Sequence, residues 1–127
     1  MFHYTVKTGK SPEQAISDLT EQLKEEKFGV LWALDLKEKL NEKGVELDRT
    51  YHILEVCNPQ EAKKVLTEDP LVGYFLPCKI TVYEDGGSTV IGMPKPTALI
   101  GFMDNDRLTS IAQDIEKRLV ACVDRSV

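Results

Sequence analysis

The stretch CKITVYEDGGSTVI (residues 78–91) decides the fold, because it reads as two strands joined by a tight turn. In its first half apolar and polar residues alternate, which places Ile80 and Val82 together on one face of a strand. The DGG sequence that follows is typical of a short hairpin turn. The stretch therefore predicts two antiparallel strands, at residues 78–84 and 89–91.

Three further strands are predicted upstream of this hairpin, and they have the expected length for strands in globular proteins. They cover residues 2–6, 30–34 and 51–56. Residues 30–34 (VLWAL) form a continuous apolar run, which is typical of a strand that is covered on both faces. We therefore interpret Trp32, at the centre of that run, as a core residue.

Two helices begin with clear start signals. Ser11 can cap a helix whose first position is Pro12, and Asn58 can do the same for a helix that starts at Pro59. The apolar residues Ala62, Val65 and Leu66 are expected to face inward in the second of these helices. That helix should end at residue 69, because the proline that follows disfavours helical geometry there.

The remaining segments are a short helix, an ambiguous region and a long terminal helix. Residues 37–43 predict the short helix, and residues 92–103 are open between a loop, a helical turn and a lid. From Asn105 onward, apolar residues recur on one helical face, which predicts a long helix across the sheet. The residues on that face are Leu108, Ile111, Ala112, Ile115 and Leu119, followed by Cys122 or Val123.

The composition is that of one globular domain over residues 1–127, with 42% hydrophobic and 29% charged residues. The net charge is −5, and neither half is basic, so we expect no nucleic acid partner. The longest uncharged runs are far shorter than the roughly 20 apolar residues that cross a bilayer, so we expect no membrane partner. The absence of a secretory leader and the odd count of 3 cysteines favour a cytoplasmic protein.

The motifs of the common enzyme chemistries are missing from the sequence. It contains no GxxxxGK phosphate loop, no GxSxG elbow, no HExxH and no CxxC. We therefore predict no catalytic set and no cofactor.

Cys57 and Cys78 are the pair of residues that most suggests chemistry. Cys57 leaves a strand just before a capped helix, and the positive end of that helix favours a thiolate. Strand alternation, however, turns Cys57 away from the core and places Cys78 on the core face with Ile80 and Val82. Two interpretations stay open, in which the cysteines are either small packing residues or a thiol or metal site.

His52 extends the second interpretation to a metal site. With Cys57 and Cys78 it would supply three ligands of the kind that zinc prefers, but without the spacing of a metal motif. His52 shares its strand face with Leu54 and Val56, which favours a histidine packed in or beside the core. We therefore expect no metal, and keep these three residues as the alternative.

Asn58 and Pro59 are a candidate for binding a small anion or carboxylate. Backbone amides at the start of a helix attract anions, and Lys79 could serve as a charge partner. Structural capping of the helix explains the same residues more simply.

Four segments, taken in order, resemble a known family. They are SPEQAISDL (residues 11–19), FGVLWALDL (28–36), EVCNPQEA (55–62) and DPLVGYFLPCKITVYEDGG (69–87). Together they resemble the bacterial and archaeal family called domain of unknown function 302, from the first strand to about residue 103. The succession of NP, DP and LPCKITVYE is the most specific part of this resemblance.

The resemblance implies an α+β domain similar to a single copy of the TATA-binding-protein-like fold. Such a domain has a curved, mainly antiparallel sheet of about five strands. It also has an N-terminal helix, short intervening helices and a long C-terminal helix packed on the sheet. Homodimers are known in the family, so the resemblance implies a homodimer, and it brings no catalytic residues with it.

The resemblance assigns matching positions to residues of this sequence, but it assigns them no functional role. Asn58 and Pro59 match its strand-to-helix turn, and Leu76 with Pro77 matches its entry into the hairpin. Many relatives lack thiols at the positions of Cys57 and Cys78, so these thiols do not serve a function shared by the whole family.

Two functions are consistent with these observations. The first is a homodimeric, non-enzymatic module that binds a small molecule or a protein where three bends of the chain meet, near residues 57–59, 76–78 and 94–103. Its candidate ligand-binding residues are Cys57, Asn58, Pro59, Leu76, Pro77, Cys78 and Lys79. The second is a thiol-dependent redox or metal-handling protein that uses Cys57 and Cys78.

Overall fold

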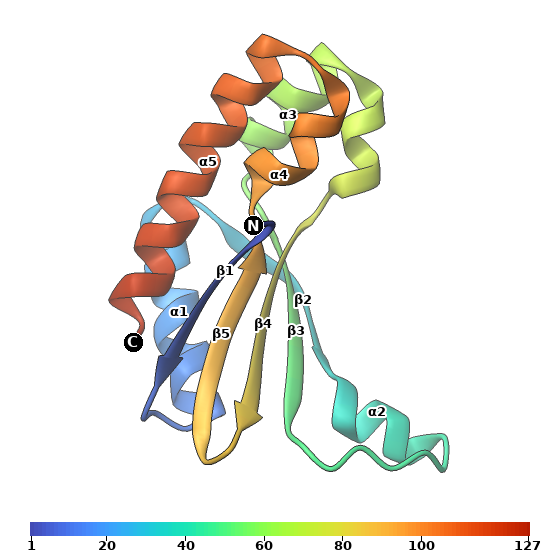
Figure 1. Ribbon diagram of the computed structural model, residues 1–127, viewed down its shortest axis with the longest axis vertical. Coiled ribbons are helices and arrows are strands. Elements are labelled where there is room, and N and C mark those ends of the chain that lie inside the picture. The colour runs from blue at the N-terminus through green and yellow to red at the C-terminus, as the bar shows by residue number, and fades with distance from the viewer.

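A five-stranded antiparallel sheet forms the centre of the molecule in the computed structural model, which describes residues 1–127. The strands are arranged in the order β1-β5-β4-β3-β2, and every neighbouring pair is antiparallel (Figure 1). The strand bounds are β1 His3–Thr8, β2 Gly29–Asp35, β3 Tyr51–Cys57, β4 Cys78–Asp85 and β5 Ser88–Pro94. The predicted α+β class with an antiparallel sheet is confirmed.

The helices differ greatly in length, and the longest one closes the chain. The α-helices are α1 Pro12–Glu25, α2 Leu36–Glu42, α3 Pro59–Glu68, α4 Pro96–Ile100 and α5 Asp106–Arg125. Two 3₁₀ segments complete the set, η1 Pro70–Phe75 and η2 Gly101–Met103. The long C-terminal helix predicted from Asn105 onward is confirmed, and Asn105 is its N-cap. No helix combines the length and the apolar character needed to cross a membrane.

The β4–β5 hairpin forms as its turn residues predict. Asp85 pairs with Ser88, so that only Gly86 and Gly87 lie in the loop between the two strands. Their φ angles are 59° and 88°, a backbone conformation that glycine adopts without the steric cost that a Cβ atom would impose. The turn therefore fixes the register of the two central strands.

The main core lies on one face of the sheet, beneath α1 and α5. From the sheet it takes alternate residues, such as Leu54 and Val56 on β3 and Ile80 and Val82 on β4, all almost fully buried. From the helices it takes one apolar face each, and the fully buried residues there include Ala15, Leu19, Leu23, Cys122 and Val123. The opposite face of the sheet has no helix over it (Figure 1).

A second, smaller core lies beyond the end of the sheet. It consists of Val65, Val72, Ile100, Leu108 and Ala112. These residues come from α3, η1, α4 and the first half of α5, which Figure 1 shows gathered above the sheet. We call this part of the molecule, residues 59–75 and 96–112, the cap. Because α5 runs through both cores, it holds the cap at the end of the sheet.

Strand β2 differs from its prediction, because it is an edge strand rather than a covered one. The side chain of Trp32 is 56% exposed and that of Leu31 is 63% exposed. A β-bulge between Val30 and Trp32 shifts the register, so that Val30 packs on the core while Trp32 pairs with Glu55 across the strands. The interpretation of Trp32 as a core residue is therefore wrong.

The structure also resolves one ambiguous segment and corrects the predicted inward face of α3. The ambiguous residues 92–103 complete β5 and then form the short helices α4 and η2, so the helical alternative is the one closest to the structure. In α3, Val65 is buried as predicted, but Leu66 is 40% exposed and the buried neighbour is Glu61. Glu61 takes the inward position because its carboxylate forms an ion pair with Arg118 of α5.

Candidate functional site

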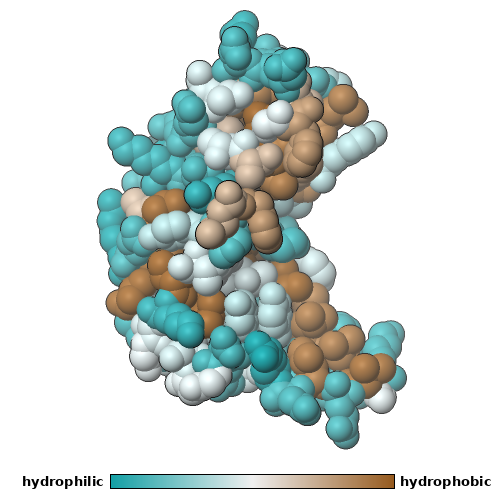
Figure 2. Space-filling view, viewed as in Figure 1, coloured by the Kyte–Doolittle hydropathy of each residue, from teal (hydrophilic) through white to brown (hydrophobic).

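A cavity of about 580 Å³ lies where the cap meets the end of the sheet. Of the 18 residues that line it, 13 are hydrophobic. Figure 2 shows the molecule hollowed on the side between the cap and α2, with hydrophobic residues along both borders of the hollow. The volume falls within the range of about 300–1,000 Å³ that is typical of small-molecule sites.

The inner wall of the cavity is apolar and well buried. Ala112, Ile115 and Leu119 contribute three successive positions on one face of α5, and none is more than 8% exposed. The cap supplies the remainder of this wall with Val65, Val72 and Ile100, each of them buried. This wall offers no polar side chain to a molecule that reaches it, so the deep part of the cavity suits an apolar group.

The outer part of the cavity carries the charged groups. Trp32, Glu55 and Lys79 are direct cross-strand partners on β2, β3 and β4, so their side chains form a row on the helix-free face. The Lys79 ammonium donates to the Glu55 carboxylate in an ion pair. Glu55 is the buried partner, because its side chain is 13% exposed and that of Lys79 is 46% exposed. Tyr74, which belongs to η1 and is 84% exposed, also lines the cavity.

The structure brings together some of the candidate residues from the sequence but not others. Leu76, Pro77, Cys78 and Lys79 all line the cavity, and the peptide bond between Leu76 and Pro77 is cis. The segment after β5 also reaches the cavity, through the residues Pro94, Pro96, Leu99 and Ile100. The third bend, Cys57, Asn58 and Pro59, is not part of the lining.

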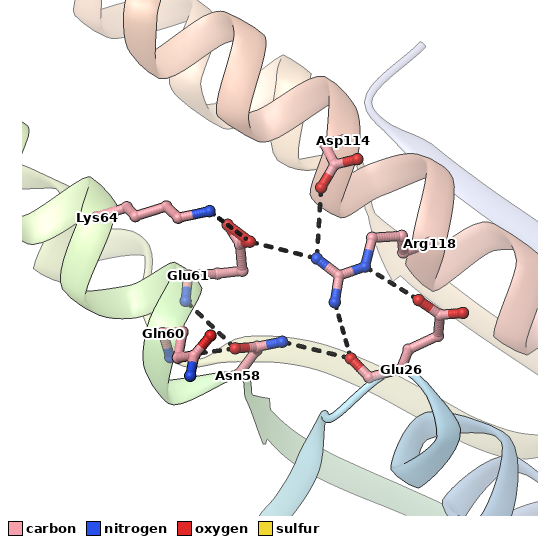
Figure 3. A network of polar contacts seen from close by, with 7 residues as sticks. All are labelled: Glu26, Asn58, Gln60, Glu61, Lys64, Asp114 and Arg118. Atoms are coloured by element: carbon pink, nitrogen blue, oxygen red, sulfur yellow. Dashed lines mark hydrogen bonds and ion pairs between the residues drawn. The ribbon is translucent and has the colours of Figure 1, made fainter.

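Asn58 lies outside the cavity because its side chain serves the local structure. Its Oδ1 atom accepts from the amides of Gln60 and Glu61, at 3.1 and 3.2 Å, and its Nδ2 atom donates to the Glu26 carbonyl at 3.3 Å (Figure 3). Pro59 occupies the first turn of α3. The Gln60 and Glu61 amides, which could have held an anion, therefore already donate to the Asn58 side chain.

Arg118 on α5 links this turn to the rest of the molecule. Its guanidinium donates to the Glu26 side chain at 3.1 Å, to the Glu26 carbonyl at 2.8 Å, and to Glu61 and Asp114 at 3.3 Å each (Figure 3). It also lies 5.2 Å from the centre of the Phe28 ring. The network joins α1, α3 and α5, and so stabilises the position of the cap.

No disulfide joins any of the cysteines in the structure. All three are free, and Cys78 packs against the main core whereas Cys57 does not. Burial raises the pKa of Cys57, and burial together with the charges of Cys57 and Glu55 raises the pKa of Cys78 to about 11. Burial of the Cys57 thiol therefore opposes the thiolate that the start of the helix was expected to favour.

His52 does not complete a metal site with the two cysteines. Its Nε2 atom is buried without a hydrogen-bond partner, and its Cα pairs with that of Val82 on β4. The structure contains no group of three or more His, Cys, Asp and Glu side chains that could hold a metal ion. His52 and Cys78 follow the core-facing alternation, while Cys57 follows the opposite one, so the alternative ligand set His52, Cys57 and Cys78 does not converge.

Cys78 is expected to react about 100-fold more slowly with iodoacetamide at pH 8 than an ordinary thiol does, because only the thiolate attacks. The rate should rise with pH up to about 11, where the thiol ionises. The raised pKa also means that stability falls as the pH rises from 9.0 towards about 11, since the unfolded thiol loses its proton first. Mass spectrometry of peptides, with the urea-unfolded protein as the control, measures the rate. Equal rates for Cys78 in both states would contradict this expectation.

Trp32 and Glu55 are among the cavity residues that were not foreseen as site residues. The position of Glu55 could have been predicted from the sequence, because a charged residue between the buried Leu54 and Val56 must point to the other face of the sheet. The position of Trp32 could not have been predicted, since its orientation depends on the bulge before it. The apolar wall on α5 was predicted only as part of the core.

Comparison with known proteins gives a family and a close structural relative. Residues 4–126 match the family described as "Domain of unknown function DUF302". A crystal structure described as an uncharacterized conserved protein DUF302 from Bacillus stearothermophilus is 57% identical, with a TM-score of 0.97. That comparison covers 100% of this chain and 99% of the other. No curated protein matches the chain.

Proposed function

Because the chain belongs to the DUF302 family, whose description assigns no activity, we propose a function from the geometry of its cavity. The protein is a non-enzymatic module that binds an apolar small molecule between the cap and the sheet. The observation that carries this proposal is the apolar cavity of about 580 Å³, which is wide enough for a small molecule and too small for a folded partner.

The chemistry of the lining supports retention of a ligand rather than its conversion. The titratable side chains among the lining residues are Glu55, Tyr74, Cys78 and Lys79. Glu55 and Lys79 are paired with each other, and Cys78 keeps its proton at neutral pH because its pKa is raised to about 11. These groups therefore supply neither an activated nucleophile nor a free general base.

N-phenyl-1-naphthylamine tests this proposal, because it is uncharged and apolar and fluoresces more strongly in apolar surroundings. Trp32 is the only tryptophan of the chain and lies at the cavity, so its emission reports the same event. We expect saturable uptake of the probe with parallel quenching of Trp32. Uptake without saturation, or saturable uptake that leaves the Trp32 emission unchanged, would contradict the proposal.

The family resemblance also supports a homodimer, and two surface features favour it. The outer edge of β2 is unpaired, and α2 beside it has no buried residue although it carries Leu36 and Leu40. A helix of this length is marginal by itself in water, so a second copy that covers its apolar side would stabilise it. Figure 2 shows hydrophobic residues at the surface of this projecting part of the molecule.

Light scattering after size-exclusion chromatography measures the mass of the particle in solution. A dimer is expected for the natural chain and a monomer for Leu40→Asp, which places a charge on the apolar side of α2. Lys39→Asp on the exposed side of the same helix is the matched control and should remain a dimer. A monomeric natural chain would contradict the homodimer.

Three finer features of the proposal come from the same family resemblance and from the composition. The fold is inferred to be similar to a single copy of the TATA-binding-protein-like fold, which an antiparallel sheet with its two long helices on one face supports. The net charge of −5 argues against DNA as the partner. Three free cysteines support a cytoplasmic location.

A further inference from the structure

The charges at the cavity are arranged unequally. Glu55 and Lys79 are the only charged residues in the lining, and the carboxylate is the more deeply placed of the two, with side-chain exposures of 13% and 46%. The Glu55 carboxylate makes no hydrogen bond or ion pair other than that with Lys79. A carboxylate that is mostly shielded from water is stabilised by a cation nearby, whereas the ammonium group of a half-exposed lysine is solvated well by water.

The surroundings of Glu55 suit a cation with an apolar body. Trp32 is its direct neighbour on β2, and Tyr74 and Phe75 line the same cavity, so the cavity that holds the carboxylate also presents aromatic rings. Aromatic faces attract cations through the negative potential above the ring. The apolar wall on α5 and the cap then accommodates the uncharged part of the molecule.

We propose that the cavity binds a bulky organic cation, such as a lipophilic quaternary ammonium or phosphonium ion or a hydrophobic amine, with its positive charge beside Glu55. This inference rests on the proposed binding function and names the class of ligand. On binding, the ligand replaces the Lys79 ammonium as the partner of Glu55, and Lys79 moves into water. The net charge of −5 also favours the approach of a cation over that of an anion.

Tetraphenylphosphonium and tetraphenylborate test the sign of the charge, because the two ions have nearly the same size and shape. We expect tetraphenylphosphonium to bind at least about tenfold more tightly, as measured by calorimetry and by Trp32 fluorescence. Equal affinity for the two ions, or tighter binding of the borate, would overturn the inference.

Substitutions of the two charged residues test the arrangement itself. Glu55→Gln should weaken tetraphenylphosphonium binding at least about tenfold, and Lys79→Met should strengthen it by about threefold because the competing ammonium is gone. Lys64→Met removes a comparable lysine, paired with Glu61 outside the cavity, and should change nothing. Unchanged binding by Glu55→Gln, or weaker binding by Lys79→Met, would overturn the inference.

The uncharged probe separates this inference from the proposed function. If N-phenyl-1-naphthylamine binds and quenches Trp32 but the phosphonium ion has no advantage over the borate, the cavity is a binding site and only the cation class is wrong. If none of the three compounds binds, the proposed function is wrong as well. Circular dichroism of Glu55→Gln and Lys79→Met confirms that each variant is folded before its affinity is compared.

Discussion

The Ala112→Leu variant is expected to lose at least about tenfold in affinity for N-phenyl-1-naphthylamine while it keeps the fold of the natural chain. Ala112 lies on the inner wall of the cavity and is 2% exposed. A larger side chain at this position occupies space that the ligand needs, and an open cavity accepts it with less strain than a filled core would. Fluorescence titration measures the affinity, and circular dichroism checks the fold.

Ala121→Leu is the matched control for this prediction. Ala121 lies on the same helix and is half-buried, but it does not line the cavity, so the same substitution there should leave the affinity unchanged. Ile100→Phe narrows the cavity from α4 and serves as a second variant if Ala112→Leu does not fold. Full affinity in a folded Ala112→Leu or Ile100→Phe variant would place the probe elsewhere.

Arg118→Met is expected to lower the free energy of unfolding by about 2–3 kcal/mol, because it leaves the mostly buried Glu61 carboxylate without its arginine partner. The Glu61 side chain is 12% exposed and would keep only its contact with Lys64. Methionine preserves the apolar length of the side chain, so the effect reports the guanidinium rather than packing. This expected loss of stability is smaller than that for a fully buried ion pair because the Arg118 side chain is 24% exposed.

Urea unfolding measures this loss of stability and needs two comparisons. Arg107→Met removes an arginine that is 81% exposed and pairs only with Glu68, and it should cost less than about 0.5 kcal/mol. Arg118→Lys should recover only part of the stability, because an ammonium cannot reproduce the forked contacts to Glu26, Glu61 and Asp114. If Arg118→Met were as stable as Arg107→Met, the network would not hold the cap.

The parts of the fold that depend on neighbouring residues in the chain could be predicted from the sequence. The DGG turn, the caps at Ser11, Asn58 and Asn105, and the apolar face of α5 each act within a few residues, and each appears in the structure. The position of β2 at the edge of the sheet could not be predicted, because an apolar run looks the same in a central strand and in one that borders a cavity.

The candidate site was only partly predictable, for a related reason. Leu76, Pro77, Cys78 and Lys79 were singled out as candidate ligand-binding residues, and they do line the cavity. Part of the inner wall is formed by α5, which is distant in sequence from residues 76–79. The packing of the cap decides which apolar residues of α5 face the cavity and which face a neighbouring side chain. The row Trp32, Glu55 and Lys79 depends on the register of three strands, which includes a bulge.

Methyl NMR of the isoleucine, leucine and valine side chains, recorded while N-phenyl-1-naphthylamine is added, locates the bound molecule directly. The largest chemical-shift changes are expected at Val65, Ile100, Ile115 and Leu119, which form the inner wall of the cavity. The methyl groups of Leu36 and Leu40 on α2 lie outside the lining and should stay nearly unchanged. Changes concentrated on α2, with the cavity methyl groups unaffected, would show that the hollow beneath the cap is not the binding site.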